Sequence, residues 1–466
     1  MNTLAALPGA DQAKIVERDQ HCISRHNISP NALKVLYALR DAGFYAFLVG
    51  GGVRDLLLGG TPKDFDIATD ATPEQLKKVF RNARIIGRRF KIVHIHFGRE
   101  IIEVTTFRAH HEQQNEIADD VSRRQIQGLD SAHSTGGMLL RDNVYGTIDA
   151  DALRRDFTVN ALYYTIDRFQ VLDFCNGLDD LQSKQIRIIG DARERYKEDP
   201  VRMLRALRFA AKLRFEIEAN TRAPIDELAH LLESISPARL FDETIKLFTS
   251  GNSLETFKLL KEFRVGRYLF APTMEVLELA RADEPANRLI DLALINTDNR
   301  LAEGKSITPA FLFAAFLWPV LQKRVARSSN QAAQEQPALL QQCADAVIHE
   351  QLQYTAIPKR FTIATKEIWE LQARLQRTNK RSIASAFSHP RFRAAYDFLL
   401  LREESGEDLQ GIGQWWTNYQ LGDTAQQTKM TGTLADVKKR RRRGSKRKPA
   451  ATLERTLERT PERKPE

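Results

Sequence analysis

The segment Leu48–Thr69, LVGGGVRDLLLGGTPKDFDIAT, constrains the fold of this chain more than any other stretch. The apolar residues Phe44–Val49 predict a buried strand, and Gly50–Gly60 predict a glycine-rich turn that leads into a short helix. A second strand is predicted over Asp64–Thr69. Further strands are expected over Lys91–Phe97 and Glu100–Phe107, and the whole indicates an α+β unit with a mixed sheet.

Two carboxylates lie one residue apart in that second strand. Side chains two apart in a strand point to the same side, so Asp64 and Asp66 should share one face while Phe65 and Ile67 face the core. Like charges this close oppose joint ionisation unless a cation lies between them. The pair therefore suits Mg²⁺ held together with phosphates, although an isolated Asp-x-Asp is more often a solvated strand face.

The glycines between the two strands favour a phosphate-binding turn. Gly50, Gly51 and Gly52 let the backbone approach a ligand, and the following helix offers free N–H groups to an anion. A dinucleotide fingerprint is excluded because Asp55 occupies the place of its third glycine, and no GxxxxGK[ST] loop occurs. A phosphate-cradling turn with Arg54 as charged partner and a plain tight turn both fit these residues alone.

Two arginine-rich segments follow. In RRDFTVNALYY (Arg154–Tyr164), the two arginines can fork onto phosphate oxygens, while an aspartate and an asparagine can bond ribose hydroxyls. In EDPVRMLRALRFA (Glu198–Ala210), Asp199 and Pro200 mark a helix start, and arginines then recur every three residues on one broad side. An Asp and an Arg together can address the polar edge of adenine. In isolation, either segment could be an ordinary charged helix.

Together these motifs resemble the signature of the nucleotidyltransferase superfamily that includes DNA polymerase beta, and its class II branch in particular. That branch contains the bacterial poly(A) polymerases and the CCA-adding enzymes. The resemblance implies that two Mg²⁺ ions bind at Asp64 and Asp66 and that ATP is the substrate. It assigns nucleotide binding to Gly50, Gly51, Arg54, Lys63, Arg154, Arg155, Asn160, Asp199, Arg202, Arg205 and Arg208.

Enzymes of this kind need a third carboxylate near the pair. Glu103 lies in a predicted neighbouring strand and is favoured as the metal-side acid by sheet geometry. Asp156 is expected to be essential, either facing the nucleotide or acting as an acid. The sequence does not decide which of the two is the third acid at the metal. For Glu103, the alternative is an exposed strand residue with no role in catalysis.

Other features favour the poly(A) polymerase side of the branch. The stretch IIGRRFKIVHIHFG (Ile85–Gly98) resembles one typical of bacterial poly(A) polymerases, and Arg88 and Arg89 in it are expected to contact RNA phosphates. An extension precedes the first strand, and no His-Asp dipeptide of an HD phosphohydrolase domain occurs. The predicted function is template-independent addition of AMP to RNA 3′ ends, with release of pyrophosphate and promotion of RNA decay. A CCA-adding enzyme and a non-catalytic RNA-binding protein are the alternatives.

The expected organisation has five parts. These are an N-terminal extension (1–30), a catalytic head (31–175), a helical, base-selecting neck (176–270), a helical RNA-binding body (271–421) and a disordered basic tail (422–466). Residues 109–137 show no apolar period and are expected to form a mobile loop. In QWW (Gln414–Trp416), stacking on RNA bases is possible in principle, but core packing is favoured.

Charge and cysteine usage indicate the kind of partner and the cellular compartment. The net charge is +10, and residues 438–466 contribute 13 Lys/Arg and 4 Glu, a balance of +9. This concentration favours a polyanion partner over a merely solubilising tail. The resemblance implies that the partner is single-stranded RNA of any sequence, bound at Lys438, Lys439, Arg440, Arg441, Arg442 and Arg443. The sequence has three widely spaced cysteines, no recognisable signal peptide and no apolar run long enough to span a bilayer, which favours a reducing cytosol. The resemblance implies that this is a bacterial cytoplasm.

Overall fold

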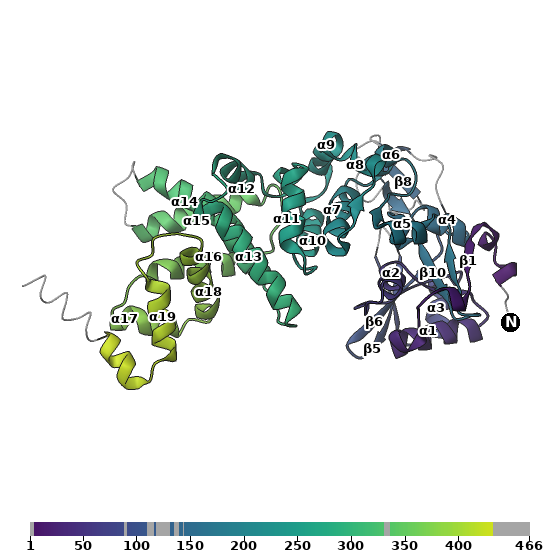
Figure 1. Cartoon of the computed structure of the whole chain (residues 1–466), viewed down its shortest axis with the longest axis horizontal. Helices are drawn as coiled ribbons and strands as arrows, with labels where there is room; N and C mark the ends of the chain where they lie inside the picture. The colour runs from purple at the N-terminus through teal and green to yellow at the C-terminus, as the bar shows by residue number, and fades with distance from the viewer. Residues whose placement is uncertain are drawn as a thin grey trace, which may run out of the picture.

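The computed structural model describes residues 4–87, 91–109, 116–117, 131–134, 139–142, 144–329 and 336–431. It is elongated, with a sheet-containing head at one end and a helical body at the other (Figure 1). The predicted α+β head with a mixed sheet, followed by a helical body, is confirmed. The division into five parts stays a prediction. The expectation of disorder over 422–466 was wrong at its start, because residues 424–431 are helical, and the part beyond residue 431 lies outside the described residues.

An eight-stranded sheet forms the centre of the head, in the order β1-β11-β10-β2-β3-β6-β5-β4. β3 and β6 run parallel, and the other neighbours run antiparallel. The strands are β1 (Lys14–Val16), β2 (Ala46–Val49), β3 (Asp66–Thr69), β4 (Ala83–Ile86), β5 (Ile92–Phe97), β6 (Glu100–Thr106), β10 (Leu162–Thr165) and β11 (Val171–Asp173).

Two separate cores cover the two faces of this sheet. On one face, α1 (Pro30–Asp41) and α2 (Gly51–Leu57) pack against β2, and α3 (Pro73–Val79) packs against β4 and β5, in the core that includes Leu48 and Ile67. On the other face, a smaller core around Val49 and Tyr163 is covered by the N-terminal segment and α4 (Ile148–Leu153). The alternation of side chains along each strand thus separates the two cores, and the second face also carries Asp66.

Local sequence signals set several boundaries. The Thr72 hydroxyl accepts the Gln75 N–H while the Gln75 side chain accepts the Thr72 N–H, so α3 begins with a capping box and Pro73 at its first position. The strand expected from Asp64 begins instead at Asp66, because Asp66 is the first residue paired with β2 and β6. The strand expected from Phe44 likewise begins at Ala46.

The expectation of no regular structure over residues 109–137 was wrong in part. Within that range the structure describes β7 (Glu116–Ile117) and β8 (Ser131–Ser134), which pair with β9 (Leu139–Asp142) in a three-stranded sheet. Such short strands of mostly small or polar residues give no periodic apolar pattern to read. The rest of the range, apart from Ala109, lies outside the described residues.

Helices dominate the chain after the head sheet, apart from a two-stranded sheet of β12 (Gln185–Ile186) and β13 (Glu216–Ile217). The neck region contains α5 (Gly177–Ser183), α6 (Ala192–Glu198), α7 (Val201–Leu213), α8 (Ala219–Arg222), α9 (Ile225–Leu228), α10 (Pro237–Phe248) and α11 (Ser253–Glu262). The body contains α12 (Arg267–Leu279), α13 (Pro285–Ala302), α14 (Pro309–Ser329), α15 (Gln336–Gln351), α16 (Lys359–Leu375), α17 (Lys380–Phe387), α18 (Phe392–Glu404) and α19 (Ile412–Leu421).

The apolar helix α14 lies at the centre of the body. It contacts α12, α13, α15, α16 and α18, which explains the long apolar run from Ala310 to Leu321 as a core segment. No helix in the described part of the chain is both long enough and apolar enough to cross a membrane. Trp416 is fully buried and its indole donates to the Leu375 carbonyl at 2.8 Å, so the core interpretation of that residue is confirmed.

Candidate active site

Two carboxylates lie next to each other on the parallel strands β3 and β6. Asp66 and Glu103 are register partners, so their side chains leave the sheet on the same face. Phe65 and Ile67 are buried in the core of the opposite face. Burial, followed by the nearby charges of Glu103 and Asp64, raises the pKa of Asp66 to about 6, although Arg155 acts to lower it.

The three acids differ in exposure. Asp64 is exposed just before β3, whereas Asp66 is half-buried at its start. The Glu103 side chain is 47% exposed, and its Oε1 lies 3.1 Å from Nε2 of His94 on the adjacent strand β5. Asp66 and Glu103 therefore place negative charge that water can reach on one face of the sheet.

No three His, Cys, Asp or Glu side chains of the described residues converge closely enough to define a metal position. The donor chemistry still fits a hard cation, because the carboxylates of Asp66 and Glu103 are oxygen ligands on one face of the sheet. Burial, and next the repulsion from Glu103, raise the pKa of Asp66, so the ionised form of Asp66 is disfavoured unless a positive charge lies beside it. A divalent ion would remove that repulsion.

A cavity of about 420 Å³ opens beside these acids, where the head meets α7 and α10. It brings together most of the residues predicted to bind the nucleotide, from segments far apart in sequence. Lys63, Asp64, Glu103, Arg154 and Arg208 lie outside its lining, and Lys63 is exposed. The lining comprises Gly50, Gly51, Arg54, Asp66, Arg155, Asp156, Asn160, Asp199, Val201, Arg202, Arg205, Phe209, Arg239 and Glu243.

The glycine turn lets a ligand approach the backbone closely. Gly50 has φ 70° and ψ −139°, a backbone conformation that side chains strongly disfavour. A Cβ at Gly50 would lie 3.7 Å from an Nη atom of Arg155, so it would fill the space between the turn and that guanidinium. Arg54 is buried one turn later, where it donates to Asn160 Oδ1 at 2.6 Å and to Asp55 at 2.8 Å.

A buried carboxylate that the sequence analysis missed holds the arginine pair. Asp151 is 1% exposed and accepts hydrogen bonds from Arg154 Nε at 3.2 Å, Arg155 Nη2 at 3.0 Å and the Tyr163 hydroxyl at 2.7 Å. The same hydroxyl accepts from Arg155 Nε at 2.8 Å. Burial alone would raise the pKa of Asp151, but Arg155 and Arg154 hold it below its usual range. Arg155 is thereby fixed from two sides.

Asp156 faces the neck. Its Oδ2 accepts from Arg205 Nε of α7 at 2.7 Å, and its Oδ1 accepts from the Phe157 N–H at 2.8 Å and from Asn160 Nδ2 at 3.3 Å. Burial acts to raise the pKa of Asp156, but the ion pair with Arg205 and the hydrogen bonds lower it to about 2. Asp156 is therefore a permanent anion that joins head and neck.

The far end of the cavity is built by α7 and α10. Asp199 Oδ2 accepts from Arg239 Nη2 at 2.7 Å, and Arg202 donates to Glu198 at 2.6 Å. Arg54, Arg205 and Arg208 lie over the Phe209 ring at 5.3, 5.5 and 4.4 Å from its centroid. Burial, and next the positive charge of the adjacent Arg205, lower the pKa of Arg208 to about 10.

Some predicted sites cannot be placed. Arg88, Arg89 and the tail residues Lys438–Arg443 lie outside the described residues. Among the residues that sequence reasoning missed, Asp151 could have been found from its spacing. It precedes the arginine pair by three and four positions on a helix, which predicts ion pairs with both arginines. Arg239 and Glu243 had none, because their place at the cavity depends on how α10 packs.

The acids beside an arginine-lined cavity, presented by a mixed sheet, define a nucleotidyltransferase. In agreement, a solved structure of a CCA-adding enzyme in an apo form superposes with a TM-score of 0.56 at 19% identity, covering 87% of each chain. Family models described as poly A polymerase head domain, probable RNA and SrmB-binding site of polymerase A, and polymerase A arginine-rich C-terminus match residues 46–187, 214–277 and 331–448.

Curated relatives narrow the class to one family. The poly(A) polymerase I of Salmonella typhimurium is 47% identical over 448 residues, which is 95% of this chain and 93% of that one. The chain belongs to this bacterial poly(A) polymerase family. A CCA-adding enzyme of Lactobacillus helveticus is 35% identical over 250 residues, only 53% of this chain. The predicted poly(A) polymerase function is thus confirmed over its CCA-adding alternative.

Proposed function

We propose that the cavity between head and neck is where ATP is held while its AMP is transferred to an RNA 3′ end. The observation that carries this proposal is the joining, in one cavity, of the glycine turn, Arg155, Asp156 and Asp66. The RNA 3′-oxygen attacks the α-phosphorus, the bond to the bridging oxygen breaks, and pyrophosphate leaves. No template strand is needed for this chemistry.

Asp64, Asp66 and Glu103 are the proposed Mg²⁺ ligands. When bound, two such ions lower the pKa of the RNA 3′-hydroxyl and stabilise the leaving pyrophosphate. Glu103 fits the role of third acid because it is the register partner of Asp66. Asp156 fits a different role, since its carboxylate is engaged by Arg205.

The chain's own groups position the nucleotide. Arg155, fixed by Asp151 and Tyr163, faces the cavity and can hold the triphosphate beside the Gly50 turn. Arg54 and Arg154 contribute positive charge nearby but are already bonded to Asn160 and Asp151. Asp156 and Asn160 lie where ribose hydroxyls would be bound.

Asp199 and Arg202 are proposed to read the adenine edge. The ion pair from Arg239 fixes the Asp199 carboxylate, and Arg202 is held by Glu198. A fixed donor and acceptor pattern rejects bases that leave a buried polar group unpaired. The aromatic ring of Phe209, also in the lining, gives the base an apolar contact.

The helical body and the basic tail are proposed to bind single-stranded RNA through phosphates, with little dependence on sequence. The family model that covers residues 214–277 is named for RNA and SrmB binding, which supports an RNA contact in the neck as well. The proposed setting is the bacterial cytoplasm, and the proposed role is to tag RNA for decay.

The decisive experiment supplies Mg²⁺, a generic RNA and each nucleotide singly. Long homopolymeric tails with ATP alone are expected. Addition of CTP and ATP only to truncated tRNA would overturn the proposal. Absence of any incorporation by protein that still binds RNA would indicate a non-catalytic RNA-binding protein.

A further inference from the structure

A second basic surface lies in the folded body. The segment from Arg374 to Arg393, RLQRTNKRSIASAFSHPRFR, contains six Lys or Arg and no Asp or Glu. It spans the end of α16, all of α17 and the start of α18. The net charge of the chain does not reveal this cluster of positive charge, because acidic residues elsewhere cancel it in the sum.

Four of the six cations have no acidic partner among the described residues. Arg374, Arg377, Lys380 and Arg381 are all exposed, and we refer to them as the basic corner. The other two differ, because Arg391 pairs with Glu367 and Arg393 with Asp397, each at 3.0 Å. Unpaired exposed cations at this density attract counterions, whose release favours binding of a polyanion.

An aromatic side chain stands beside these charges. Phe387 is 50% exposed and lies seven residues after Lys380 on α17, hence on the same face, with the exposed Ala384 between them. Its ring is supported by Phe392 at 4.9 Å and by the edge of Tyr419 at 6.3 Å. The adjacent side of α17 buries Ile383 and Ala386 in the core that it shares with α16, α18 and α19.

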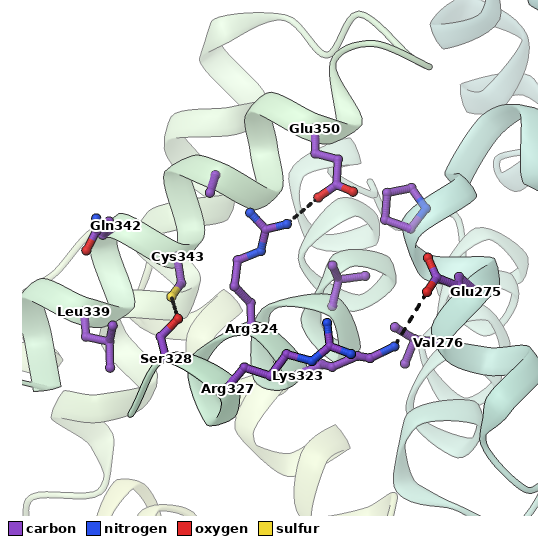
Figure 2. A pocket seen from close by; sticks show the side chains of 13 residues that line it. Glu275, Val276, Lys323, Arg324, Arg327, Ser328, Leu339, Gln342, Cys343 and Glu350 are labelled. Carbon is purple, nitrogen blue, oxygen red and sulfur yellow. Dashed lines mark hydrogen bonds and ion pairs between the residues drawn. The ribbon is translucent and has the colours of Figure 1, made fainter. Parts of the chain in front are cut away.

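A cavity elsewhere in the body contains Lys and Arg side chains that are paired with acidic residues. It measures about 570 Å³ and lies between α12, α14 and α15 (Figure 2). There Arg324 pairs with Glu350 at 2.6 Å and Lys323 with Glu275 at 3.9 Å. Those pairs stabilise contacts between helices, so their cations are less available to a ligand than those of the basic corner.

We propose that the basic corner and Phe387 form a binding surface for single-stranded RNA. The cations would contact successive phosphates, and one base would stack on the Phe387 ring, an arrangement that tolerates any sequence. The inference rests on the proposed function, which makes RNA the substrate. An acidic protein would satisfy the charges, but it gives no reason for a supported, half-exposed aromatic ring beside a small residue.

The position of this surface indicates which part of the RNA it holds. α17 lies at the end of the body away from the head (Figure 1). An RNA whose 3′ end is in the head can reach α17 only with nucleotides far upstream of that end. The surface therefore distinguishes long RNA from short primers.

The test uses the full chain, a fluorescent single-stranded RNA and a salt titration. Replacing all four cations of the basic corner by Gln should reduce the slope of log affinity against log salt by about 3, at roughly 0.7 per phosphate contact. The matched control replaces Lys323 and Arg324 by Gln and should keep the slope of the unchanged chain. An unchanged slope in the four-residue variant would overturn the proposal.

Two further measurements separate the alternatives. Phe387→Leu retains apolar packing but removes the ring face, and should weaken RNA binding by about fivefold or more without changing the salt slope. In AMP transfer, the ratio of kcat/KM for long RNA to that for a short primer should fall in the four-residue variant. Unchanged RNA affinity together with lost binding of an acidic protein would assign the surface to that protein instead. Failure of the unchanged chain to extend even the short primer would contradict the proposed function, not this surface.

Discussion

Glu103 is the register partner of Asp66 across a parallel strand pair, and this places their carboxylates on one face. Asp156, the other candidate for the third acid, is bonded to Arg205 instead. The two acids therefore have different electrostatic surroundings. Glu103, after burial, acts to raise the pKa of Asp66, whereas the ion pair with Arg205 holds the pKa of the buried Asp156 low. This difference can be tested by substitution.

Glu103→Gln should lower AMP incorporation by about a hundredfold or more, with a much higher Mg²⁺ requirement, because one of the proposed metal ligands is lost. Asp156→Asn should chiefly raise the KM for ATP. Glu100→Gln is the matched control, since Glu100 lies on the same strand but bonds Asn31 of α1. Equal Mg²⁺ dependence of Glu103→Gln and the unchanged enzyme would remove Glu103 from the metal site.

The raised pKa of Asp66 predicts a pH effect on the metal-free protein. The folded state holds a proton on Asp66 up to about pH 6, whereas the unfolded chain releases it near its ordinary value of 3.8. Stability contributed by this group is therefore present below about pH 4 and is lost as the pH rises through 6. Asp66→Asn should unfold at a higher temperature than the unchanged protein at pH 7.5, in the presence of a chelator. The difference should disappear near pH 4, and a constant difference would contradict the assignment.

Asp156 predicts the opposite pH dependence. Its pKa of about 2 in the folded state lies below the ordinary 3.8, so its stabilising contribution exists above pH 4 and is lost as the pH falls through 2. The contribution is about 2 kcal/mol at neutral pH, from a shift of nearly two pKa units at 1.36 kcal/mol each. Urea unfolding at pH 7 should show Asp156→Asn less stable by about this amount, and near pH 2 the two proteins should converge.

Tyr163→Phe tests the positioning of Arg155. The substitution keeps the ring, which lies under the Arg155 guanidinium at 5.0 Å, and removes the hydroxyl that bonds both Arg155 and Asp151. We expect the KM for ATP to rise about fivefold, with kcat changed less, and unfolding free energy to fall by about 1 kcal/mol. Tyr164→Phe is the control, because Tyr164 lies on the opposite face of β10 in the other core. Equal effects of the two substitutions would show that the hydroxyl has no special role.

Deleting the tail after Val437 should weaken RNA binding and flatten its salt dependence, because all nine cations of Lys438–Lys448 are removed. Addition of AMP to a short primer should be retained. Fluorescence anisotropy over a range of salt concentrations measures the effect. A slope that equals that of the full chain would make the tail irrelevant to RNA binding.

Much of the head was predictable from local sequence. Alternation in DFDIA placed Phe65 and Ile67 in the core, and the Thr72-Pro73 pair marked the start of α3. The proximity of Glu103 to Asp66 followed from expecting two neighbouring strands. These features depend on interactions over a few residues or on strand pairing, which patterns reveal.

Contacts between distant helices were not predictable. The ion pairs Arg205–Asp156 and Arg239–Asp199 depend on how α7 and α10 pack against the head, and no spacing in the sequence encodes that packing. The basic corner was missed for another reason. A net charge counts every cation equally, whether or not it has an acidic partner. Only the structure shows that Arg391 is paired with Glu367, whereas Arg377 is exposed and has no acidic partner among the described residues.

The pairing of Asp66 with Glu103 also limits how this chain can change length. Because successive residues of a strand face opposite sides, inserting one residue within β3 or β6 would turn a carboxylate into the core. The intervening segment with α3, β4 and β5 connects the two strands, but its length does not decide which of their side chains face the core. Insertions should therefore be tolerated in its turns, such as Gly98-Arg99, far better than single-residue insertions between Asp66 and Thr69.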